Sequence, residues 1–174
     1  MSLSIGYGCV SEQTKIYCSI ADNLTQLKTL KIFAVEPDET IATLNFKTVE
    51  SFYIYNVNPG YVFEFDDLKE LTLQSKIAQP SYLMNLAQRN RKLKKLTLIR
   101  PHRTFFDDGV IRNILNELPE LEQILVNGLE DYEYPIFKHL LGGEWEQFEM
   151  EGTVKLERHS LNVYKRFRRI SSKD

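Results

Sequence analysis

A short apolar spacing recurs along this chain and constrains its fold more than any other feature. The spacing is an apolar residue, two residues of any kind, an apolar residue, one residue of any kind and a third apolar residue. Its six copies start, at intervals of 22, 19, 25, 28 and 24 residues, at Leu27, Val49, Leu68, Leu93, Leu121 and Trp145. The last two apolar residues of a copy point to one face of a short strand, because side chains alternate along a strand. A strand of about four residues is not stable alone, so we expect the copies to pair in parallel and to share one core.

The segments between the copies return the chain to the start of the next strand, and several have the apolar spacing of a helix. Helices are predicted over Ser11–Leu24, after Pro80, over Val110–Leu118 and over Tyr134–Leu141. Asp107 or Asp108 is the expected N-cap of the third helix. For the remaining two returns, the sequence predicts a turn or two of helix within Glu36–Leu44 and a loop over Asn56–Phe65.

The copies resemble the strand motif of the leucine-rich-repeat family in its irregular intracellular forms. Leu68–Leu73 (LKELTL) and Leu93–Leu98 (LKKLTL) match this motif best, and the resemblance covers residues 3 to 151. It implies an α/β fold, a leucine-rich-repeat solenoid with one short parallel strand per repeat and mostly helical returns. The family's Asn or Cys after each strand is absent here, and its place is taken by Val35, Val57, Lys76, Pro101, Leu129 and Thr153.

The chain is expected to form a single domain over residues 1–165, followed by a basic, mobile tail over residues 166–174. Leu3 and Ile5 repeat the last two apolar positions of the pattern, so the sheet should begin with them. The ends of a stack of strands need a polar cap, and none precedes this strand. We therefore expect either a fragment of a longer protein or a partner in contact with this edge. At the other end, Thr153–Arg158 is predicted to form a final edge strand.

The sequence contains no constellation of residues that indicates catalysis, so we expect no enzymatic activity, no cofactor and no metal site. The histidines are scattered, without Cys or carboxylates at ligand spacing: His102, His139 and His159. Asp107 and Asp108 could form an acidic pair, but a helix cap explains them more simply.

Cys9 and Cys18 are read as free thiols of a reducing compartment. With neither a signal peptide nor an apolar run of roughly 18 residues, a cytoplasmic or nuclear protein without membrane contact is expected.

The residues that alternate with the apolar ones should point away from the core, onto an inner, concave sheet surface. The partner-binding residues expected on this surface are Lys31, Phe33, Tyr53, Tyr55, Thr72, Gln74, Thr97, Ile99 and Leu125. Exposed aromatic side chains ringed by polar ones are typical of protein-binding hot spots. The alternative is that flanking loops cover them.

This surface indicates a scaffold for protein–protein interactions. The uneven repeats also resemble the repeat regions of F-box proteins, which implies the substrate-recognition part of a ubiquitin ligase receptor, although the chain contains no F-box.

Two basic clusters support an alternative function, nucleic-acid binding or RNA processing. One consists of Arg89, Arg91, Lys92, Lys94 and Lys95, and the other of Lys165, Arg166, Arg168 and Arg169. Against this alternative stand the isoelectric point near 6.0 and the lack of aromatic residues between the basic ones. An acidic segment over residues 117–151, which contains ten acids and a single basic residue, also argues against it.

Overall fold

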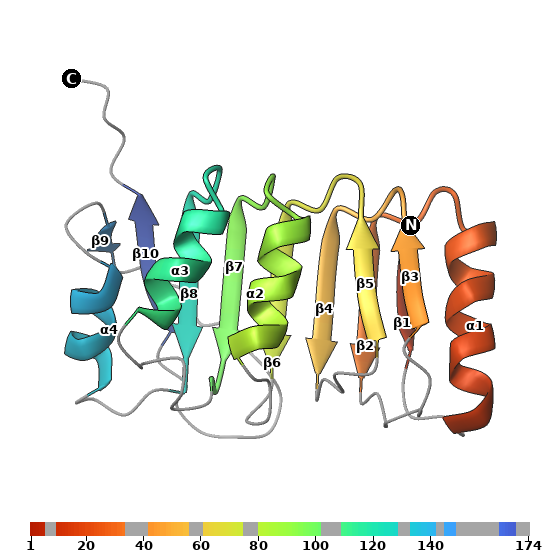
Figure 1. Ribbon diagram of the computed structural model, residues 1–174, viewed down its shortest axis with the longest axis horizontal. Helices are drawn as coiled ribbons and strands as arrows, with labels where there is room; N and C mark the ends of the chain where they lie inside the picture. Colours follow the sequence, from red (N-terminus) through yellow and green to blue (C-terminus); the bar gives the residue numbers. More distant parts are fainter. Residues whose placement is uncertain are drawn as a thin grey trace.

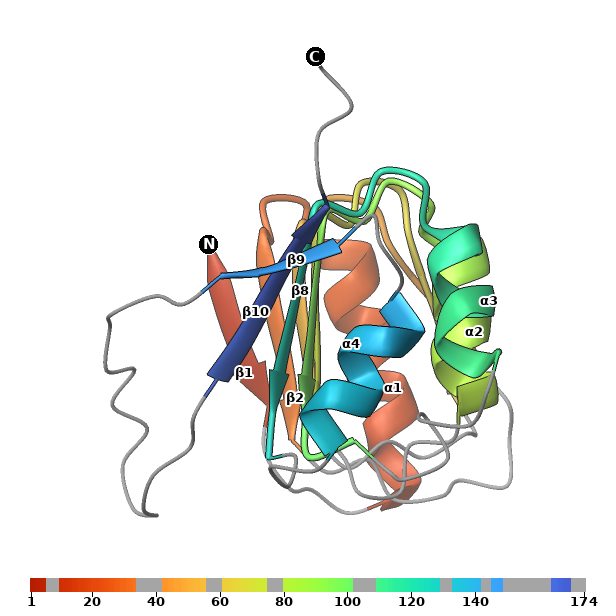
Figure 2. The ribbon, with the colours of Figure 1, turned by 90° about the vertical axis from the view of Figure 1, so that its left-hand side faces the viewer.

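One large sheet, covered on one face by helices and by a smaller sheet, organises the part of the chain that the computed structural model describes (Figures 1 and 2). The described residues are 1–5, 10–33, 42–55, 61–74, 80–101, 109–128, 133–141, 145–148 and 164–169. The large sheet holds eight strands in the order β1-β2-β4-β6-β7-β8-β10-β9. Their bounds are Ser2–Ile5 (β1), Thr29–Phe33 (β2), Ser51–Tyr55 (β4), Glu70–Gln74 (β6), Lys95–Ile99 (β7), Gln123–Asn127 (β8), Tyr164–Arg169 (β10) and Trp145–Phe148 (β9).

Six neighbouring strands of the large sheet, β1, β2, β4, β6, β7 and β8, pair in parallel. Their register aligns the recurring apolar positions in two rows across the sheet. The first row is Leu3, Leu30, Phe52, Leu71, Leu96 and Ile124, and the second is Ile5, Ile32, Ile54, Leu73, Leu98 and Val126. From β2 to β8 every side chain in these rows has an exposed fraction of 3% or less. The sequence-based prediction of parallel strands with these residues inward is thus confirmed for this part of the sheet.

The same hydrogen-bond arrangement recurs where each of these strands begins. The carbonyl oxygen of Lys28 accepts the backbone N–H groups of Glu50 and Ser51, at 2.9 and 3.0 Å. Equivalent pairs of N–H groups are bound by the carbonyls of Met1, Glu50, Lys69 and Lys94. Directly before each entry lies a buried apolar residue, which is Leu27, Val49, Leu68, Leu93 or Leu121. The apolar residue and the paired bonds together fix the register of the next strand.

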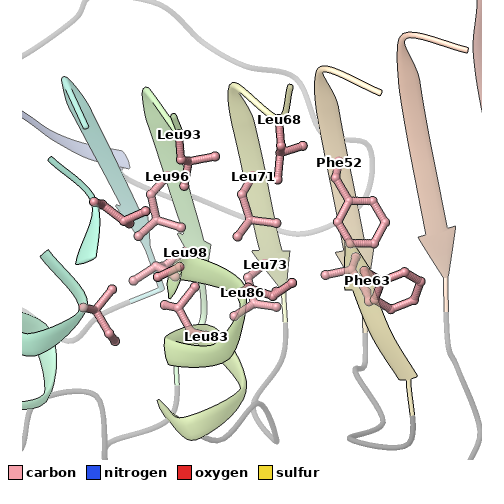
Figure 3. Packing of buried hydrophobic residues seen from close by; sticks show 14 of the residues in the cluster. Phe52, Phe63, Leu68, Leu71, Leu73, Leu83, Leu86, Leu93, Leu96 and Leu98 are labelled. Carbon is pink, nitrogen blue, oxygen red and sulfur yellow. The ribbon is translucent and has the colours of Figure 1, made fainter. Parts of the chain in front are cut away.

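The second layer lies entirely on one side of the large sheet (Figure 2). Its elements are α1 (Val10–Asn23), β3 (Ala42–Phe46), β5 (Tyr61–Phe65), α2 (Pro80–Arg89), α3 (Val110–Glu117) and α4 (Glu133–Leu141). Neighbours in this order contact each other, and β3 pairs with β5 in parallel. Phe52 of β4 packs against Phe63 and Phe65 of β5, with ring centroids 5.0 and 4.8 Å apart. Figure 3 shows how Leu83 and Leu86 of α2 extend this core over the neighbouring strands.

The predicted leucine-rich-repeat solenoid was wrong. The structure is a mixed α/β fold with an eight-stranded, mostly parallel sheet and, within the described residues, four short helices. Two of the connections expected to hold a helix or a loop contain β3 and β5 instead. Their sequences, ATLNF and YVFEF, place apolar residues at alternate positions, and Leu44, Phe46, Phe63 and Phe65 are buried. Such alternation favours a half-buried strand.

The C-terminal part of the sheet also departs from the expected all-parallel arrangement. β10 runs antiparallel between β8 and β9 and pairs with both. Residues 166–169, which were expected in a mobile tail, are therefore strand residues, of which 166–168 pair with both neighbouring strands and Arg169 pairs with β9. The predicted edge strand over Thr153–Arg158 lies outside the described residues.

The four predicted helices are present, but the third is not capped by a described aspartate. Gly109, with φ at 93°, occupies the N-cap position of α3 and makes no side-chain cap hydrogen bond. A positive φ is a conformation that glycine adopts at little cost. Asp107 and Asp108 lie outside the described residues.

Replacing one side chain of the buried rows tests the packing of this sheet. Leu96→Ala should lower the free energy of unfolding by about 2–5 kcal/mol, through lost burial and the cavity left behind. Gln123→Ala, at an exposed position of the adjacent strand, is the control and should change stability by no more than about 0.5 kcal/mol. Urea unfolding followed by circular dichroism measures both. Equal stability of Leu96→Ala and the unmodified protein would contradict this packing.

Candidate functional site

The face of the large sheet opposite the helices, called here the helix-free face, is the candidate interaction surface (Figure 2). Because side chains alternate along a strand, the register that aligns the core also aligns the residues between the core positions. One row on this face holds Ser4, Lys31, Tyr53, Thr72, Thr97 and Leu125, and the next holds Phe33, Tyr55, Gln74, Ile99 and Asn127. The structure thus brings all nine residues singled out in the sequence into two adjacent rows.

Three aromatic side chains, Phe33, Tyr53 and Tyr55, gather at one end of these rows and are called here the aromatic group. The ring of Phe33 lies 5.5 Å from that of Tyr53 and 6.4 Å from that of Tyr55, measured between centroids. All three side chains are half-buried. The Tyr53 hydroxyl donates a hydrogen bond to Oε1 of Gln74 on the adjacent strand. These contacts hold the rings in place before any ligand binds.

On β7 and β8 the side chains of these two rows are buried rather than accessible. Thr97, Ile99 and Leu125 have exposed fractions of 8, 8 and 7%, and Asn127 is exposed by only 1%. The sequence-based expectation that the first three form part of an open surface is therefore corrected, since their side chains are covered. Spacing reveals which face a residue points to, but it does not reveal what lies over that face. The accessible part of the nine-residue set is Lys31, Phe33, Tyr53, Tyr55, Thr72 and Gln74.

The first basic cluster is largely neutralised by acidic partners from other segments. Lys94 lies 3.1 Å from Glu122, and Lys95 lies 3.9 Å from Glu70. Arg89 pairs with Glu64, and Lys92 lies 4.0 Å from Asp67. These acids are far enough away in the sequence that the charge runs did not indicate the pairing. For the second cluster the structure describes only the backbone, in β10.

Glu50 lies between two lysines at the entries of neighbouring strands. Its carboxylate accepts hydrogen bonds from Lys28, at 2.5 Å, and from Lys69, at 3.0 Å. Those two bonds, the one from Lys28 being the stronger influence, lower the pKa of Glu50 below its ordinary value of 4.5. The bond to Glu50 likewise raises the pKa of Lys69, with a smaller contribution from Asp67.

The described residues contain neither a cluster of metal ligands nor a helix that could span a membrane. Among them, no three His, Cys, Asp or Glu side chains are placed to hold a metal ion. No helix in the described ranges is long and apolar enough to span a membrane. His139 and Cys18 are both exposed, and Cys18 is a free thiol. The other candidates from the sequence, Cys9, His102 and His159, lie outside the described ranges.

The position of Glu50 predicts a pH-dependent contribution to stability. Because the folded-state pKa of Glu50 is lowered, its contribution is full above the ordinary pKa and is lost as the pH falls through the folded value. Glu50→Gln should thus lower the melting temperature at pH 7, by a small amount because the pair is exposed, and should make little difference near pH 3. Glu120→Gln, at an exposed position without an ion pair to any described residue, is the control. A deficit of Glu50→Gln that persisted unchanged at pH 3 would contradict this.

Comparison with known proteins does not assign the chain to a family. No protein-family model matches it, and no curated protein or solved structure is significantly similar to it. The geometry of the helix-free face is therefore the basis on which a function can be inferred.

Proposed function

We propose that this chain is a protein-interaction module that binds a segment of a partner protein on the helix-free face, through the aromatic group. The observation that carries the proposal is the arrangement of Phe33, Tyr53 and Tyr55, which are held in mutual contact yet only half-buried. Large aromatic side chains bury much area on binding, and rings that are already ordered lose little conformational entropy.

The surroundings of the aromatic group also suit a protein ligand. Thr72 and Gln74 border it on β6, and Ser4 and Lys31 border it toward β1. An apolar centre with a polar rim is the usual anatomy of a protein–protein interface. The equivalent positions of these two rows on β7 and β8 are buried, so the accessible part of the two rows lies on β1, β2, β4 and β6.

The ion pairs of the first basic cluster argue against nucleic-acid binding as the main function. Affinity for nucleic acid comes largely from cations that neutralise phosphates. Arg89, Lys92, Lys94 and Lys95 already have carboxylate partners. Releasing those cations would cost part of the energy gained from a phosphate.

Removing one ring should weaken binding without unfolding the protein. Tyr53→Ala and Tyr55→Ala are each expected to cost about 2 kcal/mol of binding free energy, which raises Kd roughly 30-fold. The fold should survive because both side chains point away from the core. A pull-down from cell extract with the unmodified chain and Tyr53→Ala in parallel identifies the partner, and calorimetry with the purified partner then gives Kd.

The matched control is Ile136→Ala, which removes an exposed apolar side chain from α4, on the other side of the sheet. It should bind the partner as tightly as the unmodified chain. Circular dichroism verifies that every variant is folded. If both tyrosine variants are folded and keep the original Kd, the binding site lies elsewhere.

A further inference from the structure

Lys31 lies in the middle of β2, on the helix-free face and beside the aromatic group. Its neighbours across the sheet are Ser4 of β1 and Tyr53 of β4. Phe33 follows two residues later and therefore points to the same face. Adjacent strands are roughly 4.8 Å apart, so a ligand resting on the rings also reaches the Lys31 ammonium group.

Lys31 differs from the other lysines of the parallel strands in having no acidic partner. The lysines at the strand entries are all paired, with Lys28 and Lys69 bound to Glu50, Lys94 to Glu122 and Lys95 to Glu70. Those four pairs have N–O distances between 2.5 and 3.9 Å. By contrast, Lys31 forms no ion pair or hydrogen bond with the described residues, although it is half-buried.

Within the described strands, the charge of Lys31 is also not balanced by a nearby acid on the helix-free face. On the described strands from β1 to β6, the helix-free face carries two charged residues, Lys31 and Glu70. The Glu70 carboxylate lies 3.9 Å from Lys95 and 3.4 Å from the Ser51 hydroxyl. A single uncompensated cation thus borders the aromatic group.

Covering the aromatic group removes water from Lys31, and this determines which ligands fit. An ammonium group that loses its surrounding water without gaining a partner is destabilised. A carboxylate in the ligand replaces that water with a charge-assisted hydrogen bond. The same geometry penalises a ligand that places a basic residue there.

Building on the proposed function, we infer that the bound segment carries an aspartate or glutamate close to a large apolar side chain. The apolar side chain rests on Phe33, Tyr53 and Tyr55, and the carboxylate accepts a hydrogen bond from Nζ of Lys31. A nucleic acid is disfavoured because it needs a series of cations along its backbone, whereas the described residues of β1, β2, β4 and β6 place one unpaired cation on this face.

Selection from a phage-displayed library of random peptides tests this preference directly. The bait is the full chain, either unmodified or carrying Lys31→Glu, Lys31→Gln or Tyr53→Ala. Lys138→Glu is the matched control, because it changes the net charge as Lys31→Glu does but lies exposed on α4. The best peptides are then synthesised with a fluorescent label, and Kd is measured by anisotropy alongside a labelled single-stranded oligonucleotide.

The unmodified chain and Lys138→Glu should select peptides with an acidic residue within about two positions of Leu, Phe or Trp, the spacing that an extended peptide provides. Lys31→Gln should lose the acidic preference, and Lys31→Glu should replace it with a basic one. Against the best acidic peptide, Lys31→Glu should raise Kd on the order of tenfold. Exchanging the acidic residue of that peptide for lysine should restore its affinity for Lys31→Glu.

The outcomes separate this inference from the proposed function. If Lys31→Glu selects the same peptides as the unmodified chain while Tyr53→Ala loses them, the acidic preference is wrong and the binding surface stands. If no selected peptide depends on Tyr53, both ideas are wrong. If the oligonucleotide binds more tightly than any peptide and Lys31→Glu abolishes that binding, the ligand is a nucleic acid instead.

Discussion

Parallel strands cannot be joined by tight turns, so each strand of this sheet depends on its neighbour for its register. At the entries of β2, β4, β6, β7 and β8, paired N–H groups bind one carbonyl just before the neighbouring strand, and these bonds hold the register across the parallel part of the sheet. A slip by one residue would turn the buried rows toward the opposite face. The near-complete burial of these rows and the placement of the second layer over them both follow from this alignment.

The candidate site is a consequence of the same alignment. Phe33 and Tyr55 are neighbours across the sheet because Ile32 and Ile54 are. The core positions therefore determine which outward side chains meet, although the outward side chains contribute little to the core. Their identities are free to vary, and in this chain they combine aromatic rings with one unpaired cation. A surface built in this way can change its ligand preference without any change in the packing beneath it.

Spacing in the sequence predicted β2, β4, β6, β7 and β8, their buried residues, the four helices and the grouping of the site residues on one face. It did not predict β3 and β5, since two short alternating segments were read as a turn of helix and a loop. β10 was missed because its basic sequence, YKRFRR, lacks the recurring apolar spacing, so that residues 166–169 were assigned to a mobile tail. The burial of Ile99 and Leu125 and the partners of Lys94 and Lys95 depend on segments distant in sequence. Local periodicity carries no information about such contacts, and the solenoid inferred from it was wrong for the same reason.

β10 lies between β8 and β9 in the sheet, although it follows both of them in the chain. On a ribosome, β8 and β9 emerge first, and among the described strands β9 pairs with β10 alone. The sheet from β1 to β8 can grow in the order of synthesis, but the outer edge of β8 stays open until Tyr164–Arg169 emerge. Open strand edges recruit other chains, so synthesis that stopped before Tyr164 would release a product with an unprotected edge. The late strand thus covers the edge of β8 that the earlier part of the chain leaves open.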